Sequence, residues 1–420
     1  MSVHHREHLA EHTYAIVLAG GRGSRLAQLT DRRAKPAVPF AGKFRIIDFA
    51  LSNCVNSGVR RVGVLTQYKA QSLIRHVELG WSFLAASLGE YVEVVPAQQQ
   101  QGEGWYIGTA NAVYQNLSLL RESRPRHVLV LGGDHVYKMD YSIMLSEHAA
   151  RGAAVSVACI EVPLDEARDF GVMAVDDQGL VLSFEEKPVH PRPLPGRPQL
   201  ALASMGVYVF ETEVLLAELE RDAADPASSH DFGKDVIPHL VRQGSVWAHR
   251  FETSCVNRSF GRPYWRDVGT VDAYWAANID LTRVVPELNL YDDDWPIMSL
   301  QRQLPPAKFV FDGDCRGVAL DSLVSSGCIV SGATVRRSIL FSKARVAEGS
   351  LIEDSVILPN VVVGRHVRLS RTVVDKDCRL PDGFCSGLDA DADRARGLHV
   401  TAGGITLVTL PMMAQLGQQA

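Results

Sequence analysis

A glycine-rich turn with two arginines follows the first apolar run of the chain. Residues 14–19 are apolar and lead into Gly20-Gly21-Arg22-Gly23-Ser24-Arg25. Glycines let a phosphate approach backbone N–H groups closely, and arginine adds forked positive donors. The turn is no Walker A loop, because no Gly-Lys-Ser/Thr follows, and it lacks the Gly-x-Gly-x-x-Gly of a dinucleotide fold. It indicates a different phosphate site, with a turn that serves packing alone as the alternative.

A basic loop comes about ten residues later. Residues 31–39 read Asp-Arg-Arg-Ala-Lys-Pro-Ala-Val-Pro, with Lys35 in front of Pro36. The prolines stiffen this segment and favour a loop over a helix. We expect it to bring further positive charge to the same phosphates.

Two acidic residues are candidates for a metal site. Asp134 follows Gly132-Gly133 at the end of an apolar run, and Asp267 lies in Trp-Arg-Asp-Val-Gly over residues 265–269. Mg²⁺ prefers one or two carboxylates together with phosphate oxygens. Aspartate also caps helices, and Asp267 precedes a helical pattern, so the residue types alone leave both roles open.

These residues need a framework that brings them to one place. Residues 14–19, 61–66, 91–95 and 127–131 read as buried strands that alternate with helical patterns such as 70–79 and 108–120. This alternation predicts an α/β fold with a mostly parallel, Rossmann-like sheet. Ligands of such sheets bind at the carboxyl ends of the strands, where the glycine turn and Asp134 both fall.

The domain boundaries follow from composition and pattern. We expect a flexible tail over residues 1–12, a catalytic domain over 13–285 and a proline-rich linker over 286–310. Residues 311–420 then form a second domain, with aliphatic residues spaced 6-6-5 from Leu323 and Ile329 through Val374. That period fits a three-sided, left-handed parallel β-helix with oligomer contacts on its faces. Irregular strands of a sandwich are the alternative.

Composition excludes several classes of protein. The chain has 420 residues, a net charge of −5 and seven scattered cysteines without a Cys-x-x-Cys pair. We therefore expect no nucleic-acid partner, no zinc cluster and reduced thiols in a cytoplasmic protein. Neither a signal peptide nor a membrane-spanning run is expected. Histidines 4, 5, 8 and 12 read as part of a solvated tail.

Residues 18–25 and 33–36 resemble the signature of sugar-1-phosphate nucleotidyltransferases. With Phe-Arg-Ile-Ile-Asp-Phe-Ala-Leu-Ser-Asn over residues 44–53, the pattern resembles bacterial glucose-1-phosphate adenylyltransferases over nearly the whole chain. The resemblance implies a reaction of ATP with α-D-glucose 1-phosphate that gives ADP-glucose and pyrophosphate, with Mg²⁺, for glycogen or another α-glucan.

The resemblance also assigns roles to individual residues. The catalytic residues are Arg25, Lys35 and Asp134, and the metal ligands are Asp134 and Asp267. The glucose 1-phosphate site comprises Tyr106, Gly171, Glu186, Lys187 and Ser204. The ATP site comprises Leu18, Ala19, Gly20, Gly21, Gln98, Gly108 and Thr109. Regulatory positions are Arg32, Arg45, Gln67, Trp105 and Arg365, and the resemblance further implies sugar-phosphate or pyruvate-type effectors and a homotetramer.

The chain departs from the family pattern at a few positions. Asn111 stands where aspartate is common, Gly132 replaces alanine, and an acidic Glu122 lies near a position where some members carry a basic residue. The last difference puts AMP inhibition in doubt. Alternatives are a uridylyl- or thymidylyltransferase, a hexapeptide-repeat acyltransferase with His366 as its base, and a regulatory subunit without turnover.

Overall fold

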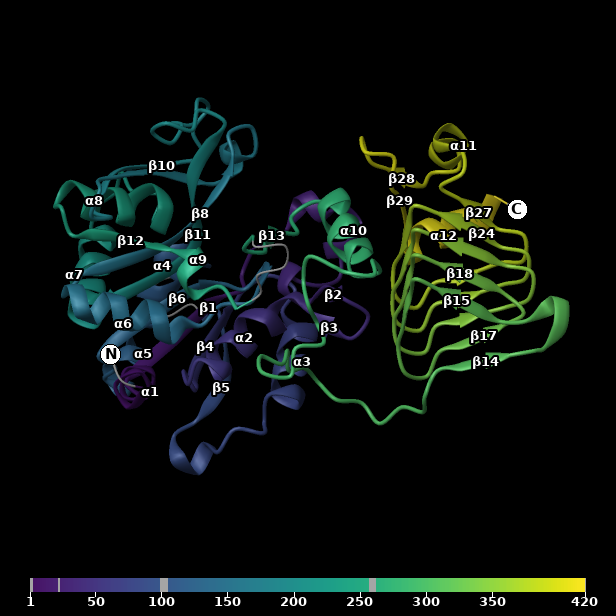
Figure 1. Cartoon of the computed structure of the whole chain (residues 1–420), viewed down its shortest axis with the longest axis horizontal. Coiled ribbons are helices and arrows are strands. Elements are labelled where there is room, and N and C mark those ends of the chain that lie inside the picture. The colour runs from purple at the N-terminus through teal and green to yellow at the C-terminus, as the bar shows by residue number, and fades with distance from the viewer. Residues whose placement is uncertain (1–2, 22, 99–104, 257–261, 420) are drawn as a thin grey trace.

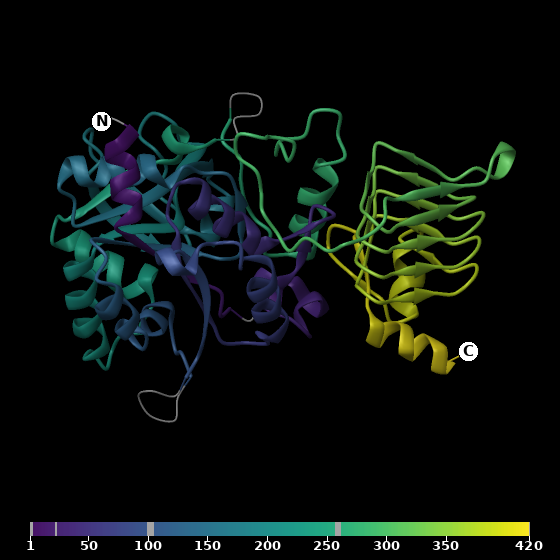
Figure 2. The same ribbon diagram turned by 90° about the horizontal axis from the view of Figure 1, so that it is seen from below.

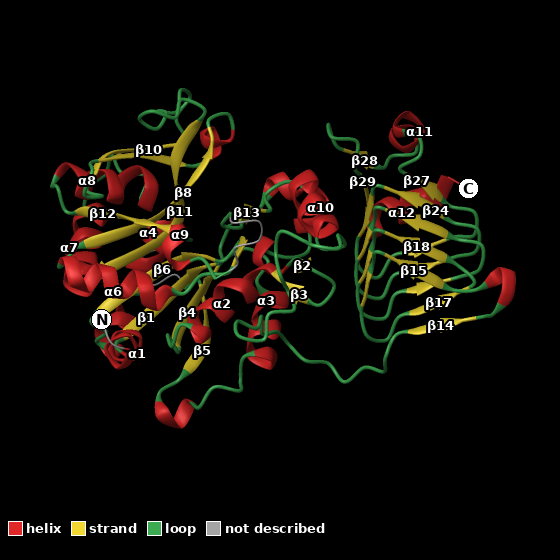
Figure 3. Ribbon diagram, in the orientation of Figure 1, coloured by secondary structure: helices red, strands yellow, loops and turns green. Residues whose placement is uncertain are grey.

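The protein consists of two lobes joined by a long connection (Figure 1). The computed structural model describes residues 3–21, 23–98, 105–256 and 262–419. The first lobe contains the mixed sheet and most helices, and the second contains a stack of short parallel strands (Figure 3). Among the described residues, no helix is long and apolar enough to cross a membrane.

The first lobe is built around strand β1 (Thr13–Leu18), which lies between two parallel neighbours. Its residues are buried nearly throughout, as expected for a strand covered on both faces. The parallel order is β6-β1-β4-β5, so the carboxyl ends of these strands meet at one edge. The partners are β4 (Arg61–Thr66), β5 (Tyr91–Pro96) and β6 (His127–Gly132).

The rest of the sheet is largely antiparallel. The long strand β11 (Leu200–Glu211) pairs antiparallel with β6, with β8 and with β9. Strand β12 runs parallel to β8, and β10 is antiparallel to β9. The outer strands are β8 (Val155–Pro163), β9 (Gly171–Val175), β10 (Val181–Glu186) and β12 (Val246–Arg250).

Helices cover this sheet, and one of them differs from its prediction. The pattern over residues 108–120 forms two helices, α4 (Thr109–Tyr114) and α5 (Leu117–Ser123), separated at Gln115 and Asn116. The other helices are α2 (Ile46–Asn56), α3 (Gln71–Gly80), α6 (Tyr141–Arg151), α7 (Thr212–Ala223), α8 (Ile237–Arg242), α9 (Phe251–Ser254) and α10 (Val271–Asp280).

The N-terminal segment is not the tail that the sequence predicts. Residues Val3–Glu11 form helix α1, which packs against α6. Leu9 and Ala10 are buried, and the Thr13 hydroxyl donates to the Leu9 carbonyl at 2.7 Å. The prediction is wrong because these two apolar residues anchor an otherwise polar helix whose sequence shows no amphipathic pattern. Figure 2 shows this helix, in purple beside the N label, against the first lobe.

The connection between the lobes follows the first lobe before it leaves. No helix or strand is assigned between residues 283 and 307. The Ser299 hydroxyl donates to the Asp48 carboxylate at 2.7 Å, and the Met298 N–H donates to Ser52 at 2.8 Å. The second domain begins slightly earlier than predicted, since its first strand, β14 (Lys308–Val310), lies inside the expected linker.

The second lobe is the predicted three-sided parallel β-helix. Each side is a sheet of successive coils: β14-β17-β20-β23-β26, β15-β18-β21-β24-β27 and β16-β19-β22-β25-β29-β28. Val335, Ile352 and Leu369 stack in register along one side of its core. Helix α12 (Leu410–Gln419) packs its apolar residues against the same core. The strands are β15 (Val318–Leu320), β16 (Leu323–Val324), β17 (Ile329–Ser331), β18 (Thr334–Arg336), β19 (Ile339–Leu340), β20 (Arg345–Val346), β21 (Leu351–Glu353), β22 (Val356–Ile357), β23 (Val362–Val363), β24 (Arg368–Ser370), β25 (Thr372–Val374), β26 (Arg379–Leu380), β27 (Cys385–Ser386), β28 (His399–Val400) and β29 (Thr406–Val408).

The 6-6-5 pattern is correct from Val335 onward but shifted in the first coil. Val324 stacks on Leu340 and Val330 on Val346, so these residues, and not Leu323 and Ile329, carry the inward register. Leu323 instead packs on the apolar cluster between the lobes.

That cluster joins the β-helix to the first lobe. Tyr274 of α10 and Phe40 belong to it together with Ile339, Val356 and Leu407 from one side of the β-helix. At its edge, the Trp275 indole N–H donates to the Asp354 carbonyl. The two domains therefore share a buried core.

Candidate active site

A cleft of about 580 Å³ lies at the carboxyl ends of β1, β4 and β6. This is the edge at which the parallel-sheet rule places ligands. Its wall comes from distant parts of the chain: the glycine turn, the basic loop, the start of α4, the end of β10 and the segment before α8.

The glycine turn forms one wall of the cleft. Leu18, Gly20 and Gly21 line it, whereas Ala19 is buried behind them and donates its N–H to the Leu65 carbonyl at 2.9 Å. Gly21 has open space on its Cβ side, so its backbone is accessible to a ligand. Arg22 lies outside the described residues.

The two candidate metal ligands come together through a pair of short strands. Strand β7 (His135–Tyr137) pairs antiparallel with β13 (Trp265–Asp267), and His135 lies opposite Asp267. This register brings Asp134 beside Asp267, and ligand atoms of Asp134, His135 and Asp267 lie within 4.8 Å of one another. The predicted convergence of the two aspartates is thus present.

Lys35 connects the two carboxylates. It begins the short helical turn η2 (Lys35–Ala37), and its Nζ lies 2.9 Å from Asp134 Oδ2 and 2.6 Å from Asp267 Oδ1. Its side chain is 6% exposed. Burial opposes the Lys35 charge, but the two carboxylates outweigh it and raise the pKa of the ammonium. Burial likewise opposes charge on Asp134, yet Lys35 and His135 hold the pKa of that carboxyl well below its usual range.

Arg25 lies at the rim of the same cluster. It is half-exposed and contacts Asp267 Oδ2 at 3.3 Å and Asp169 Oδ1 at 3.4 Å. Arg25 and Lys35 therefore place two fixed cations beside the aspartates and within one cleft with the glycine turn. Such a constellation can hold a polyphosphate.

The carboxylate pair fits a magnesium ion. Asp134 and Asp267 supply the oxygen ligands that Mg²⁺ prefers, beside a cleft with room for phosphate oxygens. Lys35 balances their negative charge from the buried side.

The predicted sugar residues divide into two groups. Tyr106, Glu186 and Lys187 line the cleft, but Gly171 and Ser204 are not among the described residues of its wall. A Cβ on Gly171 would lie 2.4 Å from the Phe184 ring and 2.9 Å from Glu186 Oε2. Gly171 thus gives space to Phe184 and to the Glu186 carboxylate, which does line the cleft, and its place in the sugar site stays a prediction.

Ser204 also lies outside the described residues that line the cleft. It is buried, and its Oγ accepts the Gly206 N–H at 3.2 Å where the pairing of β11 with β8 is interrupted. Gly206 and Tyr208 are the residues of this strand that reach the cleft. Glu186 is paired with Lys187 at 3.4 Å. Burial, together with nearby Asp231, raises the pKa of Glu186.

The predicted base-binding and coupling residues divide similarly. Gly108, Thr109 and Gln67 line the cleft. Gln98 and Trp105 are exposed and lie outside the described wall. Asn111, where the family pattern has aspartate, accepts the Ile107 N–H at 3.3 Å and the Gln115 amide at 2.8 Å, so it shapes the turn into α4.

The three predicted regulatory arginines do not form one cluster. Arg45 is part-buried and donates to the Ser72 carbonyl at 2.7 Å; burial lowers its pKa to about 10. Arg32 is exposed, and Arg365 is exposed on the β-helix beside Asp382. Among the described residues, no hydrogen bond or ion pair joins any two of them.

The sequence reasoning missed the segment before α8. Asp231, Phe232 and Gly233 line the cleft at the start of a π-helical turn (Phe232–Val236). The Asp231 carboxylate accepts the Thr109 hydroxyl at 3.0 Å and the Gly233 N–H at 2.9 Å. A Cβ on Gly233 would lie 2.5 Å from Glu186 Oε2. The Asp-Phe-Gly sequence was a signal, but it also matches an ordinary helix N-cap.

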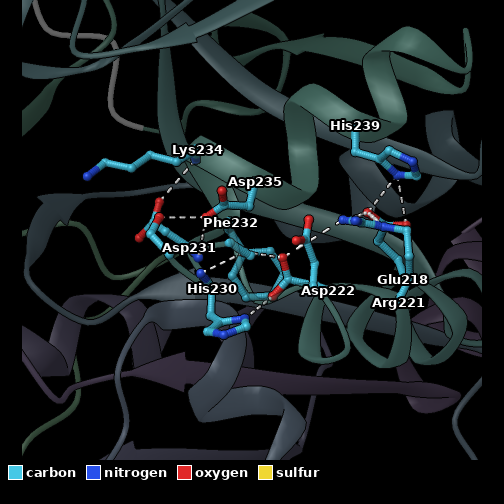
Figure 4. Close-up of polar contacts among 12 residues, drawn as sticks. Glu218, Arg221, Asp222, His230, Asp231, Phe232, Lys234, Asp235 and His239 are labelled. Atoms are coloured by element: carbon cyan, nitrogen blue, oxygen red, sulfur yellow. Dashed lines mark hydrogen bonds and ion pairs between the residues drawn. The ribbon is translucent and has the colours of Figure 1, made fainter.

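A polar network holds this segment in place (Figure 4). His230 Nδ1 lies 2.9 Å from Asp222 Oδ2, and the other oxygen of Asp222 accepts the Ser228 hydroxyl at 2.7 Å. One turn earlier on α7, Glu218 contacts both Arg221 of the same helix and His239 of α8. The network ties the cleft wall to the buried side of α7.

Comparisons with known proteins agree with this architecture. The nucleotidyl transferase family model matches residues 14–284, and the model of the GlmU-like C-terminal hexapeptide domain matches residues 305–408, as expected for a left-handed β-helix. Curated proteins named glucose-1-phosphate adenylyltransferase are similar over nearly their full length. That of Nitrosomonas europaea is 62% identical and that of Dechloromonas aromatica 60%, each over 97% of this chain and 94% and 93% of theirs. That of Albidiferax ferrireducens is 58% identical over 98% of both chains. The chain belongs to the glucose-1-phosphate adenylyltransferase family of nucleotidyl transferases.

Proposed function

We propose that this protein transfers the adenylyl group of ATP to α-D-glucose 1-phosphate, giving ADP-glucose and pyrophosphate for glycogen or another α-glucan. The observation that carries the proposal is the convergence of Lys35, Asp134 and Asp267 at 2.6–2.9 Å in one cleft with the glycine turn. The printed name of the relatives supports the choice of substrates.

The residues supply positioning and charge in place of a covalent intermediate. A phosphate oxygen of glucose 1-phosphate attacks the α-phosphorus of ATP, and the bond from that phosphorus to the β-phosphate oxygen breaks to release pyrophosphate. Backbone N–H groups near Gly20 and Gly21, with Arg25 and Lys35, hold the triphosphate and offset the charge on the leaving group. Mg²⁺, held by Asp134 and Asp267, would supply further positive charge at the phosphates.

Pyrophosphate release by the purified chain tests this function. ATP with glucose 1-phosphate is expected to give turnover that requires Mg²⁺, and UTP or dTTP much less. Preference for UTP or dTTP would assign a different base, and absence of turnover with every nucleotide would assign a regulatory subunit.

Regulation and assembly belong to the same proposal. Sugar-phosphate or pyruvate-type effectors are expected to stimulate turnover of a cytoplasmic homotetramer. Assays with and without fructose phosphates and pyruvate, and light scattering of the purified protein, measure these two properties directly.

Lys187 is expected to bind the phosphate of the sugar substrate. Its ammonium is exposed at the cleft and is held by Glu186 at 3.4 Å. Lys187→Ala should raise the KM for glucose 1-phosphate about tenfold or more, because a charged hydrogen bond is lost, with little change in the KM for ATP. Steady-state kinetics with each substrate varied separately measure the difference, and equal increases would contradict the role.

The Glu186 carboxylate is expected to lower the stability of the folded protein and to contribute to sugar binding. Its folded-state pKa is raised, first by burial and then by Asp231, so the folded protein disfavours the carboxylate that exists at neutral pH. The stability penalty is therefore present above the folded pKa and disappears below the unfolded pKa. Glu186→Gln should raise the Tm at pH 7, lose this gain in acid, and raise the KM for glucose 1-phosphate. A lower Tm at pH 7 would contradict the sign.

A further inference from the structure

A second cluster of metal-binding side chains lies at the opposite end of β6 from Asp134. His127 is the first residue of β6, Glu211 is the last residue of β11, and the two are direct partners in the antiparallel register. Helix α6 brings His148 beside them. One ligand atom from each of the three residues lies within 4.8 Å of the others.

The spacing of these atoms suits a tetrahedral ion. His127 Nε2 lies 3.1 Å and His148 Nε2 lies 3.8 Å from Glu211 Oε1. Zinc bonds of about 2.0–2.1 Å to nitrogen and oxygen place neighbouring tetrahedral ligands roughly 3.3 Å apart. The cluster therefore needs small adjustments to accept such an ion.

The hydrogen bonding of His148 leaves one ring nitrogen free for a ligand. Both histidine side chains are fully buried, and His148 Nε2 has no hydrogen-bond partner although it faces Glu211. Its other nitrogen, Nδ1, lies 2.9 Å from Ser156 Oγ. A proton on Nδ1 can be donated to Ser156 Oγ, which leaves a lone pair on Nε2 for a metal ion. A metal-bound imidazole usually donates its other ring N–H to a neighbouring acceptor in this way.

The cluster is open to solvent at its carboxylate. The Glu211 side chain is 34% exposed, which gives the cluster contact with solvent.

We propose that His127, His148 and Glu211 bind a divalent transition-metal cation of the zinc class, at a site separate from the catalytic carboxylates. Two imidazoles and one carboxylate suit an ion of this class, whereas Mg²⁺ prefers oxygen ligands alone. The ion would connect β6, β11 and α6 at the end of β6 opposite the cleft.

The test uses the full chain, stripped of metal by a chelator and kept in excess Mg²⁺ so that the catalytic carboxylates are occupied. Co²⁺ titration is followed by visible absorption, and bound Zn²⁺ is measured by elemental analysis. Glu211→Gln removes one ligand at a solvent-accessible position. Glu147→Gln is the matched control, because Glu147 forms a similar pair with His249 at 2.8 Å without a second histidine.

The parent and Glu147→Gln proteins are expected to bind one equivalent of Co²⁺ at least about tenfold more tightly than Glu211→Gln does. Zn²⁺ should raise the Tm of both proteins. Ser156→Ala should also weaken binding by about tenfold, since it frees the His148 ring. Glucose 1-phosphate turnover with Mg²⁺ should be unchanged in Glu211→Gln. Equal affinity in the parent and Glu211→Gln proteins would overturn the proposal. Binding that is lost only when histidines 4, 5, 8 and 12 are replaced by glutamine would also overturn it, because the ion would then be bound by the N-terminal segment.

Discussion

An Asp134→Asn protein is expected to fold normally and to lose turnover by a factor on the order of 10³. Asn keeps the size of the side chain but removes the charge that faces Lys35 Nζ at 2.9 Å and that would hold Mg²⁺. Lys35 retains Asp267 at 2.6 Å, so the buried ammonium keeps one partner and the fold is preserved. Pyrophosphate release measures the loss, and circular dichroism with thermal unfolding measures the fold.

Asp169→Asn is the matched control for this experiment. Asp169 is an exposed carboxylate that contacts Arg25 at 3.4 Å and lies outside the group formed by Asp134, His135 and Asp267. Its substitution should leave turnover within a few-fold of the parent. Turnover near the parent level in Asp134→Asn, or an equal loss in both variants, would remove Asp134 from the metal site.

The cleft was predictable because it depends on local patterns. Buried apolar strands, each followed by glycine or a polar residue, specify a parallel sheet and the edge at which its ligands bind. Gly20, Gln67 and Asp134 follow such strands and line the cleft, whereas Gln98, which follows β5 in the same way, lies outside the described wall. The joining of Asp134 to Asp267 needed the resemblance to a family, because the β7–β13 register connects segments that no local pattern relates.

Residues behind the cleft wall could not be located in this way. Gly171 and Ser204 lie in motifs of the family, but neither is among the described residues that line the cleft. Gly171 gives space to Phe184 and Glu186, and Ser204 accepts the N–H of the cleft residue Gly206. A motif identifies a residue near a site without saying whether its side chain faces the ligand. Asp231 was missed for the opposite reason, since its pattern is that of a helix cap although its loop faces the cleft.

In the first coil of the β-helix, the predicted spacing is correct but the predicted inward-facing residue is off by one. Leu323-Val324 and Ile329-Val330 each offer two adjacent aliphatic residues, so either residue of a pair could face inward. Within one strand, adjacent side chains point to opposite faces. Leu323 packs, partly buried, on the apolar cluster shared with the first lobe, and this contact is absent from the repeat pattern.

Replacing Arg33 with methionine is expected to destabilise the protein by about 3–5 kcal/mol, the cost of leaving one member of a buried ion pair without its partner. The Arg33 guanidinium makes two 2.9 Å bonds to Asp375 of the β-helix. The two side chains are 4% and 8% exposed. This pair connects the basic loop that carries Lys35 to the second domain.

Denaturant unfolding of Arg33→Met, Asp375→Leu and the double variant measures the coupling between the two residues. The double variant should lose less stability than the sum of the single losses, because it leaves no unpaired charge. Arg337→Ala is the matched control: Arg337 makes a similar two-bond contact to Asp354 at 2.7 and 2.8 Å, but 48% of its side chain is exposed. Its loss should cost under about 1 kcal/mol, since solvent screens exposed pairs. A loss for Arg33→Met as small as that of the control, or strictly additive losses in the cycle, would show that Arg33 and Asp375 are neighbours without energetic coupling. A large, non-additive loss would establish that the basic loop carrying Lys35 and the β-helix are energetically coupled through this contact.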